Sequence, residues 1–168
     1  MGPKEQLDNI GRADGSCVMA NDLLLPFSLD ECRQTAVVWS EESLGLPDTA
    51  TRFSPETLAL VDAHIDRKRG AALDGVLFGD LIKAGVYVGE VLIEQVGGRW
   101  VRTAKSPMAG KTQMPYVVSL DNGAWVNAME KPFKCFQGDQ QTVAGFYSAF
   151  SSPGAGGPSK PKPFWKIW

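Results

Sequence analysis

The sequence predicts a single α+β domain in which helices come first and surround a central buried helix, a small antiparallel β-meander follows, and a C-terminal helix closes the fold. Three observations predict this order. Apolar residues recur at helical spacing up to residue 96, whereas short extended runs with a hairpin turn fill the segment after it. Helical spacing then returns in the run from 140 to 150. Helices and strands that are segregated along a chain are typical of α+β folds.

Composition divides the chain into four parts. Residues 1–27 show no sustained period and are predicted to form an irregular arm. Residues 28–150 form the single domain. Residues 151–159 are only Ser, Pro, Gly and Ala, the composition of a flexible linker, and residues 160–168 form a cationic aromatic tail.

The composition also disfavours several classes of protein. A net charge of −2 over 168 residues does not suit a surface that neutralises nucleic-acid phosphates, so no nucleic-acid partner is expected. The three cysteines are far apart and form no CxxC pair, which indicates reduced thiols in a reducing compartment. The apolar run at 23–25 stops at Pro26 and is too short for a signal or membrane segment. We therefore expect a cytoplasmic protein without stable membrane insertion.

Two helices are predicted in the first part of the domain. Ser28 and Glu31 form a capping box that opens a helix over 29–44, with a strand over 35–40 as the alternative because that stretch is rich in β-branched and aromatic residues. A second helix begins at the Ser-Pro-Glu sequence of residues 54–56, which supplies an N-cap, a first-turn proline and a first-turn acid.

The third predicted helix, 73–96, is apolar around most of its circumference and is expected to lie at the centre of the domain. Gly85 and Gly89 lie one turn apart in it, which indicates that another element packs closely against that side. One narrow polar stripe remains and is expected to reach solvent; it consists of Lys83, Tyr87, Glu90 and Glu94.

Three extended runs are predicted after this helix. They cover 99–103, 116–120 and 124–129, and the Asp-Asn-Gly sequence between the last two is a hairpin signal. The run 131–137 is predicted to add an irregular strand, and Pro132 indicates an edge position for it.

The sequence contains no recognisable catalytic or metal-binding constellation, so we expect no cofactor and no metal. The Ala-Gly-Lys-Thr sequence at 109–112 resembles the end of a phosphate-binding loop, but Lys105 occupies the position of its first glycine and a strand is predicted after it. His64 is the only histidine and is expected to pack at the flank of the second helix. Asp62 and Asp66, one turn apart, are expected to face water.

Glu90 is the strongest candidate for a carboxylate with a perturbed pKa, because it lies on the polar stripe of a mostly buried helix. Tyr87 and Glu94 lie about one turn to either side of it. The favoured interpretation is that Glu90 pairs with Arg99 or Lys83 and anchors the helix. The alternative is a cleft beside Glu90, Tyr87 and Arg99 that binds a small molecule or a substrate.

The tail combines aromatic and cationic side chains, and three roles suit it: folding back onto the domain, binding a groove of a partner, or adsorbing to an anionic membrane. The first two are favoured, because three lysines and one short aromatic patch give only weak membrane attachment. The aromatic residues are Phe164, Trp165 and Trp168, and the lysines are Lys160, Lys162 and Lys166.

Two short runs form a signature, Tyr87-Val88-Gly89-Glu90-Val91 and Gly97-Gly98-Arg99-Trp100-Val101. Further matching positions are Asn127, Pro132-Phe133-Lys134, Gly138-Asp139 and Phe146-Tyr147. Together they resemble a group of small bacterial domains of unknown function that share a YxGE…GGxW pattern. Such domains look like accessory or immunity-type proteins encoded near toxins. The resemblance covers about residues 36–150, matches at Glu90, Gly98 and Trp100, and implies no catalytic residues.

The first functional hypothesis is therefore a non-enzymatic, protein-binding domain of the bacterial cytoplasm, with neutralisation of a cognate toxin as its specific form. Its acidic balance suits a basic partner. The second hypothesis is a small-molecule-binding protein or enzyme that uses the cleft near Glu90. The candidate partner-binding residues are Glu90, Tyr87, Glu94, Arg99, Phe164, Trp165 and Trp168.

Overall fold

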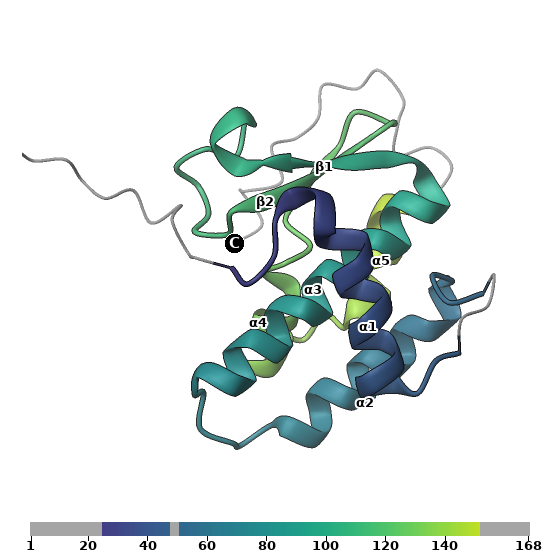
Figure 1. The fold of residues 1–168 in the computed structure, drawn as a ribbon, viewed down its shortest axis with the longest axis vertical. Helices are drawn as coiled ribbons and strands as arrows, with labels where there is room; N and C mark the ends of the chain where they lie inside the picture. Colours follow the sequence, from purple (N-terminus) through teal and green to yellow (C-terminus); the bar gives the residue numbers. More distant parts are fainter. Residues whose placement is uncertain (1–24, 48–50, 152–168) are drawn as a thin grey trace, which may run out of the picture.

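The computed structural model describes residues 25–47 and 51–151 and shows the predicted α+β fold. Figure 1 shows α3 in the centre with α1 across its front, α4 and α5 behind it, and the sheet at the top. The helices are α1 (Cys32–Leu44), α2 (Leu58–Lys68), α3 (Gly75–Val96), α4 (Lys131–Phe136) and α5 (Val143–Ser151), and the strands are β1 (Gly98–Arg102), β2 (Tyr116–Leu120) and β3 (Trp125–Val126).

The capping signals mark the 3₁₀ turns that lead into the first two helices, so α1 and α2 begin three residues after the predicted positions. The backbone N–H of Ser28 donates to Glu31 Oε2 at 2.7 Å, and a short 3₁₀ turn, Leu29–Glu31, leads into α1. The alternative strand over 35–40 is wrong, because these residues lie within α1 and bury Ala36 and Trp39 at helical spacing. A second 3₁₀ turn, Pro55–Thr57, leads into α2.

The central helix α3 is buried along most of its length, as predicted. It begins at Gly75, two residues later than expected, because Asp74 is its N-cap and accepts the Leu77 N–H at 2.8 Å. Close packing against its glycines is confirmed. A Cβ atom added to Gly85 would lie 2.4 Å from the Met129 Cα atom, and one added to Gly89 would lie 2.1 Å from Trp100 Cζ2.

The sheet is a three-stranded antiparallel meander in the order β1-β2-β3. Gly98 pairs with Leu120 at one end of β1 and Arg102 with Tyr116 at the other. The predicted hairpin joins β2 to β3, and Gly123 adopts the left-handed φ of 86° that its turn requires. The third run is shorter than predicted, since only Trp125–Val126 pairs as a strand.

The strand predicted over 131–137 is wrong, because this segment forms α4. Pro132 lies in the first turn of that helix, where its missing N–H would have no intrahelical acceptor, so it does not disfavour the helix as it would a central strand. The helix buries Phe133 and Cys135 against the core. Lys131 at its first position is also buried, and its Nζ donates to Asp139 Oδ2 at 2.6 Å.

The last helix, α5, depends on a residue of α2. Asp62, which was expected to face water, accepts the N–H groups of Val143 and Ala144 at 2.7 and 3.2 Å and so caps α5 from another element. Asp66 remains exposed as expected and pairs with Arg69 at 2.7 Å.

Parts of the predicted domain organisation lie outside the described residues. These are most of the arm, the linker after Ser151, and the tail with Phe164, Trp165 and Trp168. Phe27, the last residue of the expected arm, is buried in the core. Among the described helices, none combines the length and the apolar character needed to cross a bilayer.

Candidate functional site

Glu90 is the buried centre of a polar cluster that joins α3, β1 and α1. Its side chain is 4% exposed. Trp100 donates its indole N–H to Oε1 at 2.8 Å, and Arg33 donates from Nη1 to Oε2 at 3.2 Å. Burial raises the pKa of Glu90 above its ordinary value, and the donors Trp100 and Arg33 oppose that rise. The perturbed carboxylate expected from the sequence is therefore confirmed in direction.

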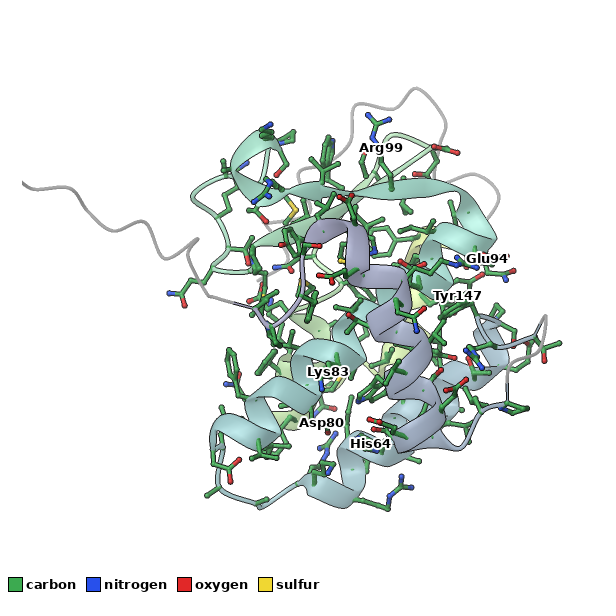
Figure 2. All side chains as sticks on the ribbon, in the orientation of Figure 1. His64, Asp80, Lys83, Glu94, Arg99 and Tyr147 are labelled. Carbon is green, nitrogen blue, oxygen red and sulfur yellow. The ribbon has the colours of Figure 1, made fainter. Side chains whose placement is uncertain are left out.

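The partners predicted for Glu90 are wrong. Arg99 is exposed on β1 and projects from the top of the sheet in Figure 2, away from the region of Glu94. Lys83 lies nearly two turns earlier on α3, in the lower part of the same view. The actual cation, Arg33, comes from α1, 57 residues before Glu90 in the chain. The spacing of polar residues within α3 does not indicate a partner on another helix, 57 residues away in the chain.

Arg33 is the exposed member of this cluster. Its side chain is 55% exposed, and Nη1 also lies 3.1 Å from Glu94 Oε2. The guanidinium carbon lies 4.9 Å from the centroid of the Phe53 ring, a cation–π distance. Glu94 is therefore the one member of the predicted polar stripe that is both exposed and joined to the cluster.

Tyr87 is not exposed either, which corrects the expected solvent edge of the helix. It is fully buried, and its hydroxyl donates to the Arg52 carbonyl at 2.5 Å and lies 2.5 Å from Thr57 Oγ1. Burial raises the pKa of this phenol. Tyr87 thus ties the connection before α2 to the central helix and cannot contact a partner in this conformation.

A second polar cluster, centred on Asp80, was missed from the sequence. His64 Nε2 lies 2.8 Å from Asp80 Oδ2, and Trp39 donates its indole N–H to Oδ1 at 2.8 Å. Lys68 Nζ lies 3.7 Å from Oδ2. Burial acts to raise the pKa of Asp80, but the hydrogen bonds from His64 and Trp39 and the nearby cationic charge outweigh it, and the pKa is lowered. The labels for His64 and Asp80 lie together in Figure 2, where α1, α2 and α3 converge.

His64 therefore packs more deeply than the predicted flank position, at 6% exposure. It meets the Trp39 ring edge-on, with centroids 5.4 Å apart. The carboxylate orients the imidazole, as in a general-base dyad, but Trp39 and Lys68 occupy the remaining positions around Asp80. The Asp80 cluster therefore joins α1, α2 and α3.

Two cavities lie away from Glu90. One of about 320 Å³ borders the Asp80 cluster and the connection between α2 and α3; it is lined by Lys68, Ala71, Ala72, Asp74, Val76, Leu77 and Asp80. The other, about 250 Å³, lies between α2 and the segment that precedes α5. Cys135 lines it, and burial raises the pKa of this thiol to about 11, so it is protonated at neutral pH. Within residues 25–47 and 51–151, no group of three or more His, Cys, Asp or Glu side chains is placed to hold a metal ion.

The exposed side of α1 and of the 3₁₀ turn before it presents several acidic side chains. We call this set of residues the α1 face; it consists of Asp30, Glu31, Gln34, Val38, Glu41 and Glu42, all exposed. Gln34, Val38 and Glu42 follow at intervals of four, so they lie in one row along the helix. The cation next to this row, Arg33, is already held by Glu90 and Glu94.

The pH dependence of stability provides a test of the Glu90 cluster. Because the folded state raises the pKa of Glu90 above 4.5, the folded protein binds this proton more tightly than the unfolded chain. Its contribution to the free energy of unfolding is therefore greatest below pH 4.5 and declines as the pH rises through the raised pKa. Glu90→Gln should remove this decline, so the stability of the variant relative to the parent should increase with pH.

Urea unfolding of the two proteins at a series of pH values measures this difference. Asp80→Asn is the matched control of opposite sign. The lowered pKa of Asp80 gives stability that is present above pH 3.8 and lost as the pH falls through the folded-state pKa, so the asparagine variant should lose less stability in acid. Parallel curves for Glu90→Gln and the parent would contradict the assignment.

Three of the residues on which the family resemblance rests, Gly89, Glu90 and Trp100, meet at the Glu90 cluster. Glu90 accepts from Trp100, and Trp100 packs against Gly89. Gly98 has a φ of 142°, and a Cβ atom on it would lie 2.4 Å from the Ser119 carbonyl oxygen. These positions therefore serve the packing of α3 against β1. No family model, no curated protein and no solved structure matches this chain.

Proposed function

We propose that this protein is a non-enzymatic binding domain that recognises a basic protein through the α1 face, and that toxin neutralisation is the specific form of this function. The observation that carries the proposal is the set of exposed carboxylates of the α1 face, Asp30, Glu31, Glu41 and Glu42, together with the exposed apolar residue Val38. Complementary charge of this kind steers a basic partner to the surface and favours it over acidic proteins.

The composition of the α1 face suits an interface. Val38 is 39% exposed and has Glu41 and Glu42 on the turn that follows it. Glu41 also pairs with the buried guanidinium of Arg52 at 2.7 Å, which fixes the C-terminal part of α1 to the chain before α2. An apolar centre with a charged surround on a rigid helix is a favourable platform for a partner.

The alternative proposal, a catalytic or ligand-binding cleft at Glu90, has less support. Both oxygens of Glu90 already accept hydrogen bonds, and its side chain is almost fully covered. Arg99, the third residue of the predicted cleft, projects from the top of the sheet in Figure 2, away from the region of Glu94. A catalytic acid or base must be within hydrogen-bond reach of a substrate, which this packing does not provide.

Charge reversal on α1 tests the proposal. The full chain is immobilised and used to capture proteins from a lysate of its native host. We expect a basic protein that elutes as the salt concentration rises, because screening weakens complementary charges. The double variant Val38→Lys/Glu42→Lys should lower its affinity by more than about tenfold, since it places two cations against a basic surface.

Asp66→Lys is the matched control, with the same change of acid to lysine at an exposed position of α2. It should leave capture unchanged. If the captured protein is a toxin, co-expression of the parent should relieve its growth inhibition and co-expression of the α1 double variant should not. Equal loss of binding in both variants, or capture that does not respond to salt, would refute the α1 face as the interface.

A further inference from the structure

The turn between β2 and β3 consists of Asp121, Asn122 and Gly123, all of which are exposed. Two backbone hydrogen bonds close it: the Leu120 N–H donates to the Ala124 carbonyl at 2.9 Å, and the Gly123 N–H donates to the Leu120 carbonyl at 3.0 Å. Gly123 has a φ of 86°, and a Cβ atom added there would meet nothing within 4 Å. The backbone conformation therefore requires glycine at this position, although the space around it is open.

Asn122 gives this turn a chemical reactivity that most turn residues lack. The peptide nitrogen of the residue after an asparagine can attack the side-chain amide carbon and close a succinimide ring. Glycine presents the least hindered nitrogen for this attack because it has no Cβ atom, and Gly123 directly follows Asn122. Asn127, the other asparagine within 25–47 and 51–151, is half-buried, precedes Ala128 and donates from Nδ2 to Thr112 Oγ1 at 2.7 Å. It therefore serves as an internal control.

A backbone contact of the Asn122 side chain favours the attack. Asn122 Oδ1 accepts the Ala124 N–H at 3.1 Å. The ring that this hydrogen bond closes includes both the Asn122 Cγ atom and the Gly123 nitrogen, which are the two atoms that must form a bond. A donor on a carbonyl oxygen stabilises the negative charge that develops there when a nucleophile adds to the carbon. The Ala124 N–H is therefore placed to stabilise the oxyanion that forms at Asn122.

Another hydrogen bond of the turn opposes the reaction in the folded chain. The Gly123 N–H donates to the Leu120 carbonyl at 3.0 Å, whereas its nitrogen becomes a nucleophile only when it loses that proton. The residues of the turn are exposed, and hydrogen bonds of such turns open without unfolding of the core. We therefore expect the folded chain to react through opening of the turn alone, and more slowly than the unfolded chain.

The amide nitrogen that this reaction removes joins the turn to α5. Asn122 Nδ2 donates to the Phe150 carbonyl at 3.3 Å. Phe150 lies in the last turn of α5, where carbonyls take donors from outside the helix, and its side chain is buried in the core. After loss of the amide, a carboxylate oxygen faces that carbonyl, and neither oxygen has a proton to donate. The new charge also lies next to Asp121 in the chain, so the reaction replaces an attractive contact with a repulsive one.

We propose that Asn122 is a deamidation site of the folded protein and that its modification releases the end of α5 from the turn. The Gly123 nitrogen forms a bond to Asn122 Cγ, the Cγ–Nδ2 bond breaks, and the proton of the peptide N–H leaves with Nδ2 as ammonia. Water then opens the succinimide. Opening at Cγ gives aspartate, and opening at the main-chain carbonyl gives isoaspartate, in which the backbone runs through Cβ and Cγ. No atom is oxidised or reduced.

Peptide mapping by mass spectrometry of the full chain after incubation tests the chemistry. In mildly alkaline buffer without denaturant we expect aspartate and isoaspartate to accumulate at Asn122 while Asn127 stays intact. Mildly acidic buffer should slow the conversion, because the attacking nitrogen must be deprotonated, and urea should accelerate it, because the turn then opens freely. Asn122→Gln keeps a side-chain amide but would have to close a larger ring, so this variant should show no conversion.

Amide hydrogen exchange of Asn122→Asp, which reproduces one product, tests the release of α5. The amides in the last turn of α5 should exchange about fivefold faster than in the parent, as expected for one lost hydrogen bond, and those of α3 should be unchanged. Gln34→Glu makes the same change of amide to carboxylate at an exposed position of α1 and should leave α5 unaffected. Three results would overturn the proposal: conversion of Asn122 only in urea, equal conversion at Asn127, or unchanged exchange of α5 in Asn122→Asp.

Discussion

Replacing Asp139 with Asn should destabilise the protein by about 3 kcal/mol, because it leaves a buried lysine without its counter-ion. Lys131 is 1% exposed, and its Nζ donates to Asp139 Oδ2 at 2.6 Å. The ring centroid of Phe146, 5.7 Å away, compensates the ammonium only weakly. The lysine in turn lowers the pKa of Asp139 through the hydrogen bond that joins them. We place the cost at the low end for a broken buried pair because Asp139 is 24% exposed and water reaches that side.

Two further variants separate the lost counter-ion from general disruption. Lys131→Met should change stability by less than about 1 kcal/mol, since an apolar chain of similar length fills the same space without a charge. Lys131→Met/Asp139→Asn should be close to Lys131→Met alone. Urea unfolding of the four proteins gives this cycle directly. If Asp139→Asn remains as harmful with Met at position 131 as with Lys, the buried charge is not the cause.

Gly85→Ala should destabilise the protein by about 2–3 kcal/mol, although alanine is the better helix former. The added Cβ atom would lie 2.4 Å from the Cα atom of Met129 and 2.7 Å from its carbonyl oxygen. These are backbone atoms beside the fully buried Met129 side chain, so α3 and the segment before α4 must move apart.

Gly79→Ala is the matched control in the same helix. Its added Cβ atom would meet nothing within 4 Å, so the ordinary helix preference should apply and the variant should gain about 0.5–1 kcal/mol. Thermal and urea unfolding of both variants measure the two effects. A gain in stability for Gly85→Ala would show that the contact between α3 and Met129 is looser than described.

The sequence predicts elements whose signals are local. Ser28 and Glu31 mark the turn that leads into the first helix, and Asp121-Asn122-Gly123 marks the hairpin, because capping and turn chemistry act over three or four residues. The two glycines of α3 indicate close packing correctly, since their cost in helix propensity requires a compensating contact.

Prediction from the sequence is wrong where contacts between distant elements determine the local structure. Proline at 132 suits an edge strand or a first helical turn equally, and burial of Phe133 and Cys135 selects the helix. Glu90 resembles an exposed stripe residue because Arg33 and Trp100, which cover it, come from α1 and β1.

The Asp80 cluster was missed for the same reason. His64 and Asp80 are 16 residues apart on two helices, and Trp39 comes from a third. Each is unremarkable in its own helix, so only the packing of α1, α2 and α3 shows that they meet. The α1 face, in contrast, can be recognised from the spacing of its residues in the sequence once the buried side of the helix is known.

Carboxylate footprinting tests the central claim, that α1 presents the surface for a basic protein partner, most directly. The full chain is labelled with a carbodiimide and an amine, alone and with its captured partner, and the modified residues are identified by mass spectrometry. We predict that the partner protects Glu42 and Asp30 and leaves Asp66 and Asp121 unchanged, all four being exposed in the chain alone. Protection of Asp66 and Asp121 with Glu42 still labelled would place the partner elsewhere and contradict the account.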